Sequence, residues 1–413
     1  MTPQILNDVP EHPQPSARID SSEKILRVGI IGCGEVAQVS HIPIFNFLRH
    51  KYRITYLCDI SEDALTHCSQ MIIPGDLTGT CVATTTNAKD LCASESVDVV
   101  LICNADEYHV EHGILALEHD KWCLIEKPLA LCFADLDALI KAENNSKGRV
   151  FVGTMRRFAP AFLEAVQEVG GMDKILYARV RSIIGPNSNF IEQSGTFPKY
   201  FTDIPSACIE ERKEKARAIN HQALEKEFGV EATDAAIRQL RILGSLNTHD
   251  LSAMREIIGM PKTVLAASLG FPGIYTALFE YDRFAVTFES GINSVPIFDA
   301  NIEIYSEDKI VKVQFDTPYI KGLPVTMAIR EKVGDRTGTS SFGYQERIVR
   351  RTYEDPYTLE FLEFYDCVVN GKEIKTGTHD ARNDLELYRM ILKAGEHTYK
   401  KNDGAGQMGK LGL

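Results

Sequence analysis

The sequence predicts an α/β fold in two parts: a parallel sheet flanked by helices, followed by an α+β domain with an open, largely antiparallel sheet. Two observations carry this prediction. From residue 25 to about 158, apolar runs alternate with helical segments, which is typical of a parallel sheet with right-handed crossovers. Between residues 263 and 350, strand-like segments follow one another through short turns, as in antiparallel hairpins.

A glycine-rich turn follows the first apolar run. It reads Gly-x-Gly-x-x-Ala at Gly32, Gly34 and Ala37. Gly32 allows a tight turn, Gly34 lets the backbone approach a pyrophosphate, and Ala37 lets the next helix pack close to the strand. The free N–H groups at the start of that helix, around Glu35 and Val36, attract phosphates. Alone, the motif also fits an ordinary glycine-rich turn.

A second strand, expected over Ile54–Cys58, ends at Asp59. Asp59 follows Gly34 by about 25 residues, close to where a dinucleotide fold places the carboxylate that binds the adenosine ribose hydroxyls. Ile60 and Ser61 come next, with no arginine to meet a 2′-phosphate, so the sequence favours NAD over NADP. The alternative for Asp59 is a turn residue at a strand end.

Composition excludes several classes of protein. The chain has 413 residues and a formal charge of −12, which argues against nucleic acid and anionic membranes as main partners. No apolar run approaches the roughly 18 residues of a membrane span. The ten cysteines form no C-x-x-C pair, so we expect reduced thiols in a cytoplasmic protein, with no disulfide framework and no metal site.

Each element of the first part is expected from its own pattern. The helix after the glycine-rich turn contains Pro43, which indicates a break or a kink. The expected strands are 27–31, 54–58, 80–83, 97–103, 122–125 and 150–153, and the expected helices are 36–48, 63–71, 88–93, 110–117 and 133–144.

The second part begins with one long strand at 175–184, followed by an irregular loop at 186–204 and a charged, solvated helix at 206–228. Thr233 is placed to cap a helix, and Gly259 is placed to end the next one. The remaining expected strands are 263–269, 275–281, 285–289, 301–305, 310–315, 325–330 and 345–350, and two helices at 357–369 and 381–396 close the chain.

Five motifs occur in an order that resembles the glucose–fructose oxidoreductase and inositol dehydrogenase (Gfo/Idh/MocA) family, from about residue 25 to 395. They are Gly32-x-Gly34-x-x-Ala37, Val100–Asn104 followed by His109, Glu126-Lys127-Pro128-Leu129, Arg156-Arg157-Phe158, and His249 ten residues before Gly259. The resemblance implies a Rossmann domain, a second domain whose sheet forms the oligomer interface, and NAD(P) chemistry on a sugar-like or polyol substrate. The expected ranges are a flexible extension at 1–24, a Rossmann NAD-binding domain at 25–158, a substrate-binding and oligomerisation domain at 159–400 and a flexible tail at 401–413.

Lys127 follows a buried strand, at the carboxyl end of the sheet where ligands bind in such folds. A lysine held there donates hydrogen bonds to a substrate hydroxyl and stabilises a developing alkoxide. The alternative is a surface lysine that closes a strand. Glu126 positions Lys127 or contacts the nicotinamide ribose, unless it forms a purely structural salt bridge.

His249 lies in the first turn of a predicted helix, whose positive end opposes protonation. A neutral imidazole accepts the hydroxyl proton as hydride leaves; the alternative is a histidine that only caps or packs. The chain departs from the family here, with Ser245 where an acid is common and Asn247 where a glycine is common. Asp250 or a water molecule is therefore a second candidate for proton acceptor.

The remaining candidates each have a structural alternative. Asn104 and His109 are expected to flank the cofactor, and His109 is equally compatible with a structural role. Arg157 is a candidate for binding a substrate carboxylate or hydroxyl, or for an ion pair within the fold. Tyr200, with Lys199, is a candidate for the substrate mouth.

The sequence thus predicts an NAD-dependent oxidoreductase acting on CH–OH groups of a sugar, polyol or related compound. A second hypothesis is an enzyme that keeps NAD bound and oxidises its substrate transiently, as in epimerisation or glycosidic cleavage. A third is a non-catalytic NAD-binding regulator, against which Lys127 and His249 argue. A homodimer or homotetramer is expected, because one face of the second sheet needs covering and large apolar faces favour association.

Overall fold

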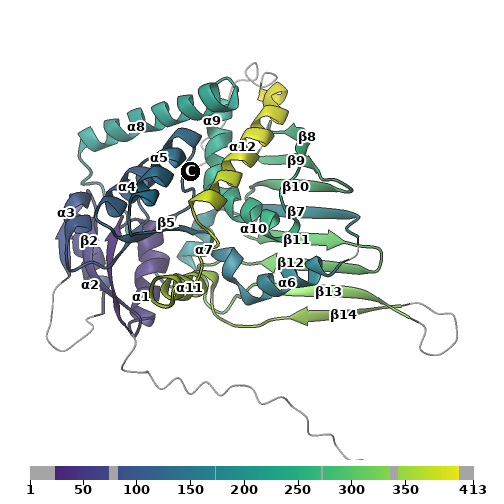
Figure 1. Ribbon diagram of the computed structural model, residues 1–413, viewed down its shortest axis with the longest axis horizontal. Helices are drawn as coiled ribbons and strands as arrows, with labels where there is room; N and C mark the ends of the chain where they lie inside the picture. The colour runs from purple at the N-terminus through teal and green to yellow at the C-terminus, as the bar shows by residue number, and fades with distance from the viewer. Residues whose placement is uncertain (1–23, 74–81, 173, 271–272, 335–342, 400–413) are drawn as a thin grey trace, which may run out of the picture.

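The computed structural model describes residues 24–73, 82–172, 174–270, 273–334 and 343–399 (Figure 1). The expected extension at 1–24, apart from Lys24, and the expected tail at 401–413 lie outside the described residues. Within the described ranges, no helix combines the length and the apolar character that crossing a membrane requires.

The first sheet has six parallel strands in the order β3-β2-β1-β4-β5-β6. This is the order of a doubly wound dinucleotide-binding sheet, in which the direction of winding reverses between β1 and β4. Its strands β4, β5 and β6 are nearly continuous apolar runs because helices cover both faces, whereas the short edge strand β3 has no buried residue. They are β1 Leu26–Ile31, β2 Tyr52–Cys58, β3 Ala83–Thr85, β4 Val99–Ile102, β5 Trp122–Glu126 and β6 Val150–Gly153.

The helices of this part lie where the sequence predicts them. Near Pro43, where the sequence predicts a break or a kink, the helical segment continues but changes type: a π-helical turn ends at His41, and the α-helix with Pro43 in its first turn begins at Ile42. Ser61 and Asn87 cap the helices that follow them. The helical segments are η1 Ala37–His41, α1 Ile42–Phe47, α2 Glu62–Met71, α3 Ala88–Ala93, η2 Asp106–Tyr108, α4 His109–Glu118, α5 Phe133–Asn144 and η3 Met155–Phe158.

The second sheet has eight strands in the order β14-β13-β12-β11-β7-β10-β9-β8. Only the pairing of β7 with β10 is parallel, so the expected largely antiparallel sheet is confirmed. The expected hairpin connections at 281–284 and 306–309 are present, between β9 and β10 and between β11 and β12. The strands are β7 Tyr177–Ile184, β8 Thr263–Ser268, β9 Ile274–Glu280, β10 Ala285–Ile292, β11 Phe298–Tyr305, β12 Lys309–Phe315, β13 Thr326–Val333 and β14 Gly343–Val349.

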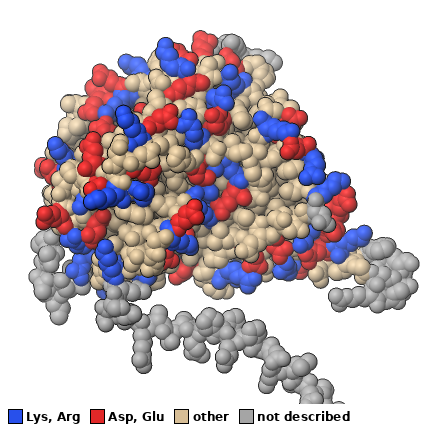
Figure 2. Space-filling model, viewed as in Figure 1, with Lys and Arg blue, Asp and Glu red and all other residues tan. Residues whose placement is uncertain are grey.

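Helices of the second part serve both sheets. The loop expected at 186–204 contains a short helix, and the expected charged helix at 206–228 is α8 followed by a π-helical turn. Figure 2 shows acidic and basic side chains mixed over this face of the molecule, as expected for a solvated helix surface. The segments are α6 Pro160–Gly170, α7 Asn187–Glu192, α8 Ser206–His221, η4 Gln222–Phe228, α9 Asp234–Ile242, η5 Leu243–Asn247, α10 Thr248–Ile258, α11 Pro356–Asn370 and α12 Thr378–Tyr399.

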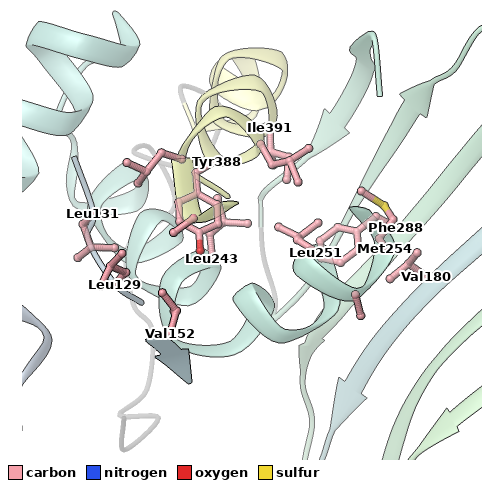
Figure 3. Packing of buried hydrophobic residues seen from close by; sticks show 14 of the residues in the cluster. Leu129, Leu131, Val152, Val180, Leu243, Leu251, Met254, Phe288, Tyr388 and Ile391 are labelled. Atoms are coloured by element: carbon pink, nitrogen blue, oxygen red, sulfur yellow. The ribbon is translucent and has the colours of Figure 1, made fainter. Parts of the chain in front are cut away.

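One hydrophobic core connects the two sheets. Leu129, Leu131 and Val152 of the first part belong to the same buried cluster as Val180 and Phe288 of the second sheet. Figure 3 shows the helices between them, which contribute Leu243, Leu251, Met254, Tyr388 and Ile391. A separate cluster joins α11 to the first sheet through Phe361, Phe364 and Tyr365. The C-terminal helices are therefore shared by both parts of the chain.

The open face of the second sheet is charged at its centre. Helices α6, α10 and α12 cover the other face. On the open face, Arg179 pairs with Glu303 at 2.9 Å, and Arg181 pairs with Glu289 at 2.7 Å and with Asp299 at 3.0 Å. The expectation of an apolar face is wrong at the centre, because the outward positions of β7 alternate with its buried residues and include these two arginines.

Candidate functional site

The two glycines of the glycine-rich turn have different surroundings. Gly32 has a φ of +108°, and a Cβ there would lie 2.6 Å from the backbone nitrogen of Asn104. Only glycine fits both the conformation and the contact. At Gly34, nothing lies within 4 Å of a built Cβ, so the backbone there is open to a ligand. Ala37 is buried at the start of η1, and the preceding residues Glu35 and Val36 are both partly exposed.

Asp59 lies beside this loop, at the end of β2. Its Oδ2 accepts a hydrogen bond from the backbone N–H of Cys33 at 2.7 Å, and its Oδ1 accepts one from Ser61 at 2.9 Å. Burial raises the pKa of Asp59, although the hydrogen bonds from Cys33 and Ser61 oppose the rise. Its carboxylate is therefore fixed at the position from which a dinucleotide fold binds ribose hydroxyls.

Tyr200 lies at the glycine-rich loop, although it is distant in sequence from Glu35, its hydrogen-bond partner there. Its hydroxyl donates a hydrogen bond to the carboxylate of Glu35, and 74% of the side chain surface is exposed. The structure thus brings Tyr200 to the predicted dinucleotide side of the site, whereas the sequence analysis expected it at the substrate mouth.

Asn104 and His109 connect the ends of β4 and β5. The His109 ring is buried, with Nδ1 2.8 Å from the carbonyl oxygen of Pro128 and Nε2 3.2 Å from that of Asn104. A neutral imidazole donates to only one of these carbonyls. Both contacts are internal, which matches the structural alternative for His109. The Oδ1 atom of Asn104 is buried and has no hydrogen-bond partner within the described chain.

His112 was missed by the sequence analysis. Its Nδ1 lies 2.9 Å from the amide nitrogen of Asn104, and its ring stacks on Tyr108 with centroids 5.7 Å apart. Burial lowers the pKa of His112 to about 4, although Glu111 acts in the opposite direction. A neutral ring at physiological pH therefore accepts the Asn104 hydrogen bond and orients that amide. No sequence signal separates this histidine from others on helix surfaces.

Lys127 and Glu126 stand at the end of β5, followed by a cis peptide bond to Pro128. The Lys127 ammonium donates to the carbonyl oxygen of Ser245 at 2.8 Å. Glu126 is buried, with Oε1 3.0 Å from Nε2 of His41 and Oε2 accepting from the backbone N–H of Lys127 at 3.2 Å. Burial would raise the pKa of Glu126, but His41 and Lys127 lower it overall. Glu126 thus lies close to the His41 ring, within the distance of the salt bridge considered as its alternative, and it also contacts the backbone of Lys127.

His249 is 7% exposed, and its Nδ1 is buried with no hydrogen-bond partner among the described residues. Burial lowers its pKa well below the ordinary value, and the positive charges of Lys127 and Arg156 add to this effect. The expected cause, a helix N-terminus, is wrong. Although α10 begins at Thr248, the helical segments α9, η5 and α10 follow one another directly, so no free helix end lies at His249.

The arginines of the Arg-Arg-Phe motif point to different partners. Arg156 is buried in an ion pair with Asp250, and its guanidinium lies 4.8 Å from the centroid of the Phe315 ring. Arg157 pairs with Glu256 at 2.6 Å and also with Asp380. The structure therefore places Arg157 in internal ion pairs, as in its structural alternative. Asp250, the second candidate acceptor, is bound in this ion pair; burial raises its pKa, although Arg156 acts in the opposite direction.

Asn247 occupies the position at which the family commonly has glycine. Its amide nitrogen donates to the Ser290 hydroxyl at 2.6 Å, and its Oδ1 accepts from the hydroxyl of Tyr275. All three side chains are buried. These bonds fix the turn that carries Ser245 and His249 to the second sheet, so the substitution adds a polar anchor to the site.

The first part of the chain, residues 26–154, matches the profile of the oxidoreductase family with an NAD-binding Rossmann fold. Inositol 2-dehydrogenase 3 of Saccharopolyspora erythraea is 30% identical over 156 residues, which cover 37% of this chain and 44% of that protein. Myo-inositol 2-dehydrogenase of Thermotoga maritima is 26% identical over 250 residues, which cover 58% of this chain and 72% of that one. The chain thus spans less than half the length of the Saccharopolyspora relative.

Solved structures show the same fold over most of the chain. The UDP-N-acetylglucosamine 3-dehydrogenase GnnA from Acidithiobacillus ferrooxidans superposes with a TM-score of 0.64 at 17% identity, covering 91% of this chain and 98% of that one. Myo-inositol 2-dehydrogenase from Lactobacillus plantarum gives a TM-score of 0.61 at 18% identity, again covering 91% and 98%. At these identities the likeness establishes the architecture.

Proposed function

Because the first part of the chain matches the oxidoreductase family with an NAD-binding Rossmann fold and resembles inositol dehydrogenases, we propose that the chain is an NAD-dependent oxidoreductase that transfers a hydride between a hydroxylated substrate and nicotinamide. The observation that carries the proposal is the meeting of Lys127 and His249. Lys127 directly follows a strand of the first sheet, and its ammonium donates a hydrogen bond to the carbonyl oxygen of Ser245. Ser245 precedes His249 by four residues, and both belong to the helical segment that packs on the second sheet. A site between the two sheets is a common location for small ligands.

The two side chains suit different halves of one reaction. Lys127 donates hydrogen bonds and stabilises negative charge on the substrate oxygen as its proton leaves. His249 is held neutral by burial and by neighbouring positive charges, and its Nδ1 lacks a partner within the described chain, so it accepts that proton. When bound, the nicotinamide supplies the hydride acceptor. Asn104 is oriented by His112, and its Oδ1, which lacks a hydrogen-bond partner among the described residues, is the atom that would contact the cofactor.

We propose NAD as the cofactor on the basis of two features at the loop. Gly34 leaves room for a pyrophosphate, and the Asp59 carboxylate suits free ribose hydroxyls and repels a 2′-phosphate. The names of the relatives, inositol and sugar-nucleotide dehydrogenases, support a sugar, polyol or related compound as the substrate class.

A screen of inositols, sugars and sugar acids with NAD, followed by nicotinamide absorbance, tests this function. We expect steady NADH formation with at least one polyol or sugar, and its loss in Lys127→Ala. A purified protein that binds NAD but gives no NADH with any compound, while it converts a substrate without net redox change, would instead establish the second hypothesis, an enzyme with retained NAD. That alternative is favoured by one observation, the contact of residues 199–203 with the dinucleotide side of the first sheet.

We also propose a homodimer or homotetramer built on the open face of the second sheet. The arginines and carboxylates on that face are already paired within the chain, and a partner subunit with the same face would meet a surface of low net charge flanked by exposed apolar residues such as Leu265 and Ile348. Light scattering at micromolar concentration should give a multiple of the 46.1 kDa chain mass. A stable monomer at that concentration would contradict the proposal.

A further inference from the structure

Residues 197–203, which we call the crossing segment, connect α7 of the second part to α8 and lie against the first sheet. The segment is held at its start by Gln38, in the helical turn after the glycine-rich loop. The Gln38 side chain accepts from the backbone N–H of Lys199 at 2.8 Å and donates to the Lys199 carbonyl at 3.1 Å. It also donates to the carbonyl of Cys33 at 3.0 Å. A buried amide thus ties the crossing segment to the loop.

The far end of the crossing segment reaches the residues that follow Asp59. Oδ1 of Asp203 accepts from the Ser61 hydroxyl at 2.5 Å, and Oδ2 accepts from the backbone N–H of Asp63 at 3.1 Å. Ser61 donates its own N–H to Asp59 at 2.9 Å. The two carboxylates, one from each part of the chain, are therefore bound to the same residue.

Asp203 is ionised at neutral pH. The hydrogen bonds from Ser61 and Asp63 lower its pKa, and its side chain is exposed to solvent. Its charge in turn acts on Asp59, whose pKa it raises after the larger effect of burial. The electrostatic effect of Asp203 thus extends to the carboxylate that faces the ribose.

Resting on the NAD-binding function proposed above, we propose that Asp203 is a specificity-determining residue of the dinucleotide site, which disfavours NADP from the second part of the chain. Asp59 binds the ribose hydroxyls in this fold, so a 2′-phosphate would have to stand next to Ser61 and between or beside both carboxylates. That phosphate carries close to two negative charges at neutral pH. Free ribose hydroxyls carry none, so Asp203 leaves NAD binding nearly unaffected.

Two other features of the segment make different predictions. If Asp203 only caps α2 and anchors the segment, its loss changes the affinity for NAD and NADP equally. Lys199 carries the opposite charge and, after burial, contributes to the lowered pKa of His67 on α2. If Lys199 has the larger effect on the electrostatic potential at the ribose, two changes in NADP affinity differ in size. In that case, removing the Lys199 charge weakens NADP binding by more than removing the Asp203 charge strengthens it.

Titration of the full-length protein with NADH and NADPH, followed by nicotinamide fluorescence, distinguishes these cases. Asp203→Asn removes the charge and keeps one oxygen acceptor, which can still accept from Ser61 or from the N–H of Asp63. We expect it to tighten NADPH binding by about fivefold at low ionic strength, from the Coulomb interaction of two charges across several ångströms of water, and to change NADH binding by less than about twofold. The gain should shrink at high salt.

Glu210→Gln is the matched control, because Glu210 is an exposed acid on α8 whose partner is Lys213. We expect it to leave both affinities unchanged. Asp203→Asn is also made in an Asp59→Asn background, where NADPH binding is strong enough to measure even if the wild type excludes it, and the same gain is expected there.

Several results would overturn the inference. Asp203 would not be a determinant if Asp203→Asn left the NADPH affinity unchanged in both backgrounds, or if it changed the affinity for both dinucleotides equally. The same conclusion would follow if Lys199→Gln weakened NADPH binding by more than Asp203→Asn strengthened it. In each of these cases, NADH binding by the wild type would leave the proposed function intact. A wild type that binds neither dinucleotide would overturn the proposed function and this inference with it.

Discussion

Replacing each glycine of the glycine-rich turn by alanine should separate folding from cofactor binding. Gly32 has a φ of +108°, where a residue with a Cβ is strained, and its Cβ would stand 2.6 Å from the nitrogen and 2.8 Å from the Cα of Asn104. Those neighbours are backbone atoms directly after the end of β4, which cannot move aside as the end of a flexible side chain could. The left-handed conformation costs about 1–2 kcal/mol and overpacking about 1–3 kcal/mol, so Gly32→Ala should lower the free energy of unfolding by about 2–5 kcal/mol.

Gly34→Ala is the matched variant, since nothing lies within 4 Å of its Cβ. It should unfold in urea within about 0.5 kcal/mol of the wild type, as surface substitutions do. Its methyl group would stand where a pyrophosphate approaches the backbone, so NADH affinity should fall by tenfold or more, a change of about 1.4 kcal/mol. Urea unfolding and fluorescence titration on the same preparations give both quantities. A Gly34→Ala protein that binds NADH like the wild type would refute the placement of the dinucleotide, and an undiminished stability of Gly32→Ala would refute the steric argument.

Three further variants test the site. Asp59→Ala should weaken NAD far more than NADP, and a wild type that binds NADP tenfold tighter, a gap of about 1.4 kcal/mol, would contradict the role of Asp59. Lys127→Ala and His249→Ala should each lower kcat by about 10²–10⁴-fold with nearly unchanged NAD affinity, and an unaltered kcat of His249→Ala at every pH would remove it from the mechanism. Because the pKa of His112 is about 4 in the folded chain and near 6.5 when unfolded, the unfolded state binds more protons between these values, so stability decreases as the pH is lowered through this range. Between pH 7 and pH 5 this loss should be about 2 kcal/mol smaller in His112→Asn than in the wild type, and equal losses would show that His112 does not titrate in this way.

The sequence predicted what local pattern controls. Buried parallel strands are continuous apolar runs, so the strands of the first sheet and the ends that carry Asp59 and Lys127 were expected close to their observed positions. Thr233 does cap its helix, with its hydroxyl accepting from Ala236 at 3.2 Å. Gly259 ends the helix at a positive φ of 82°. Each of these depends only on residues within a few positions.

Contacts between distant segments were not predictable. Arg156 and Arg157 are adjacent and chemically identical, and only the turn η3 decides that the first faces Asp250 and the second faces Glu256 and Asp380. Tyr200 reaches Glu35 across 165 positions because the crossing segment returns to the first sheet. Similarly, the helix end expected before His249 is absent, since the π-helical turn η5 joins α9 to α10 without a break. Side-chain direction and chain crossing depend on packing that no local pattern contains.

The core that Figure 3 shows between the two sheets sets a limit on how such a chain can be rearranged during evolution. Gly244 lies so close to the first part that a Cβ there would stand 2.8 Å from Leu131. A cut after Phe158 would expose Leu129, Leu131 and Val152, which are buried in the shared cluster. If the first part of this chain were replaced by that of another protein, the replacement would therefore need a surface that packs against η5, α10 and α12. Under the proposed function, cofactor and substrate preferences would therefore be inherited together, and new specificities would be more accessible through loops such as the crossing segment than through exchange of halves.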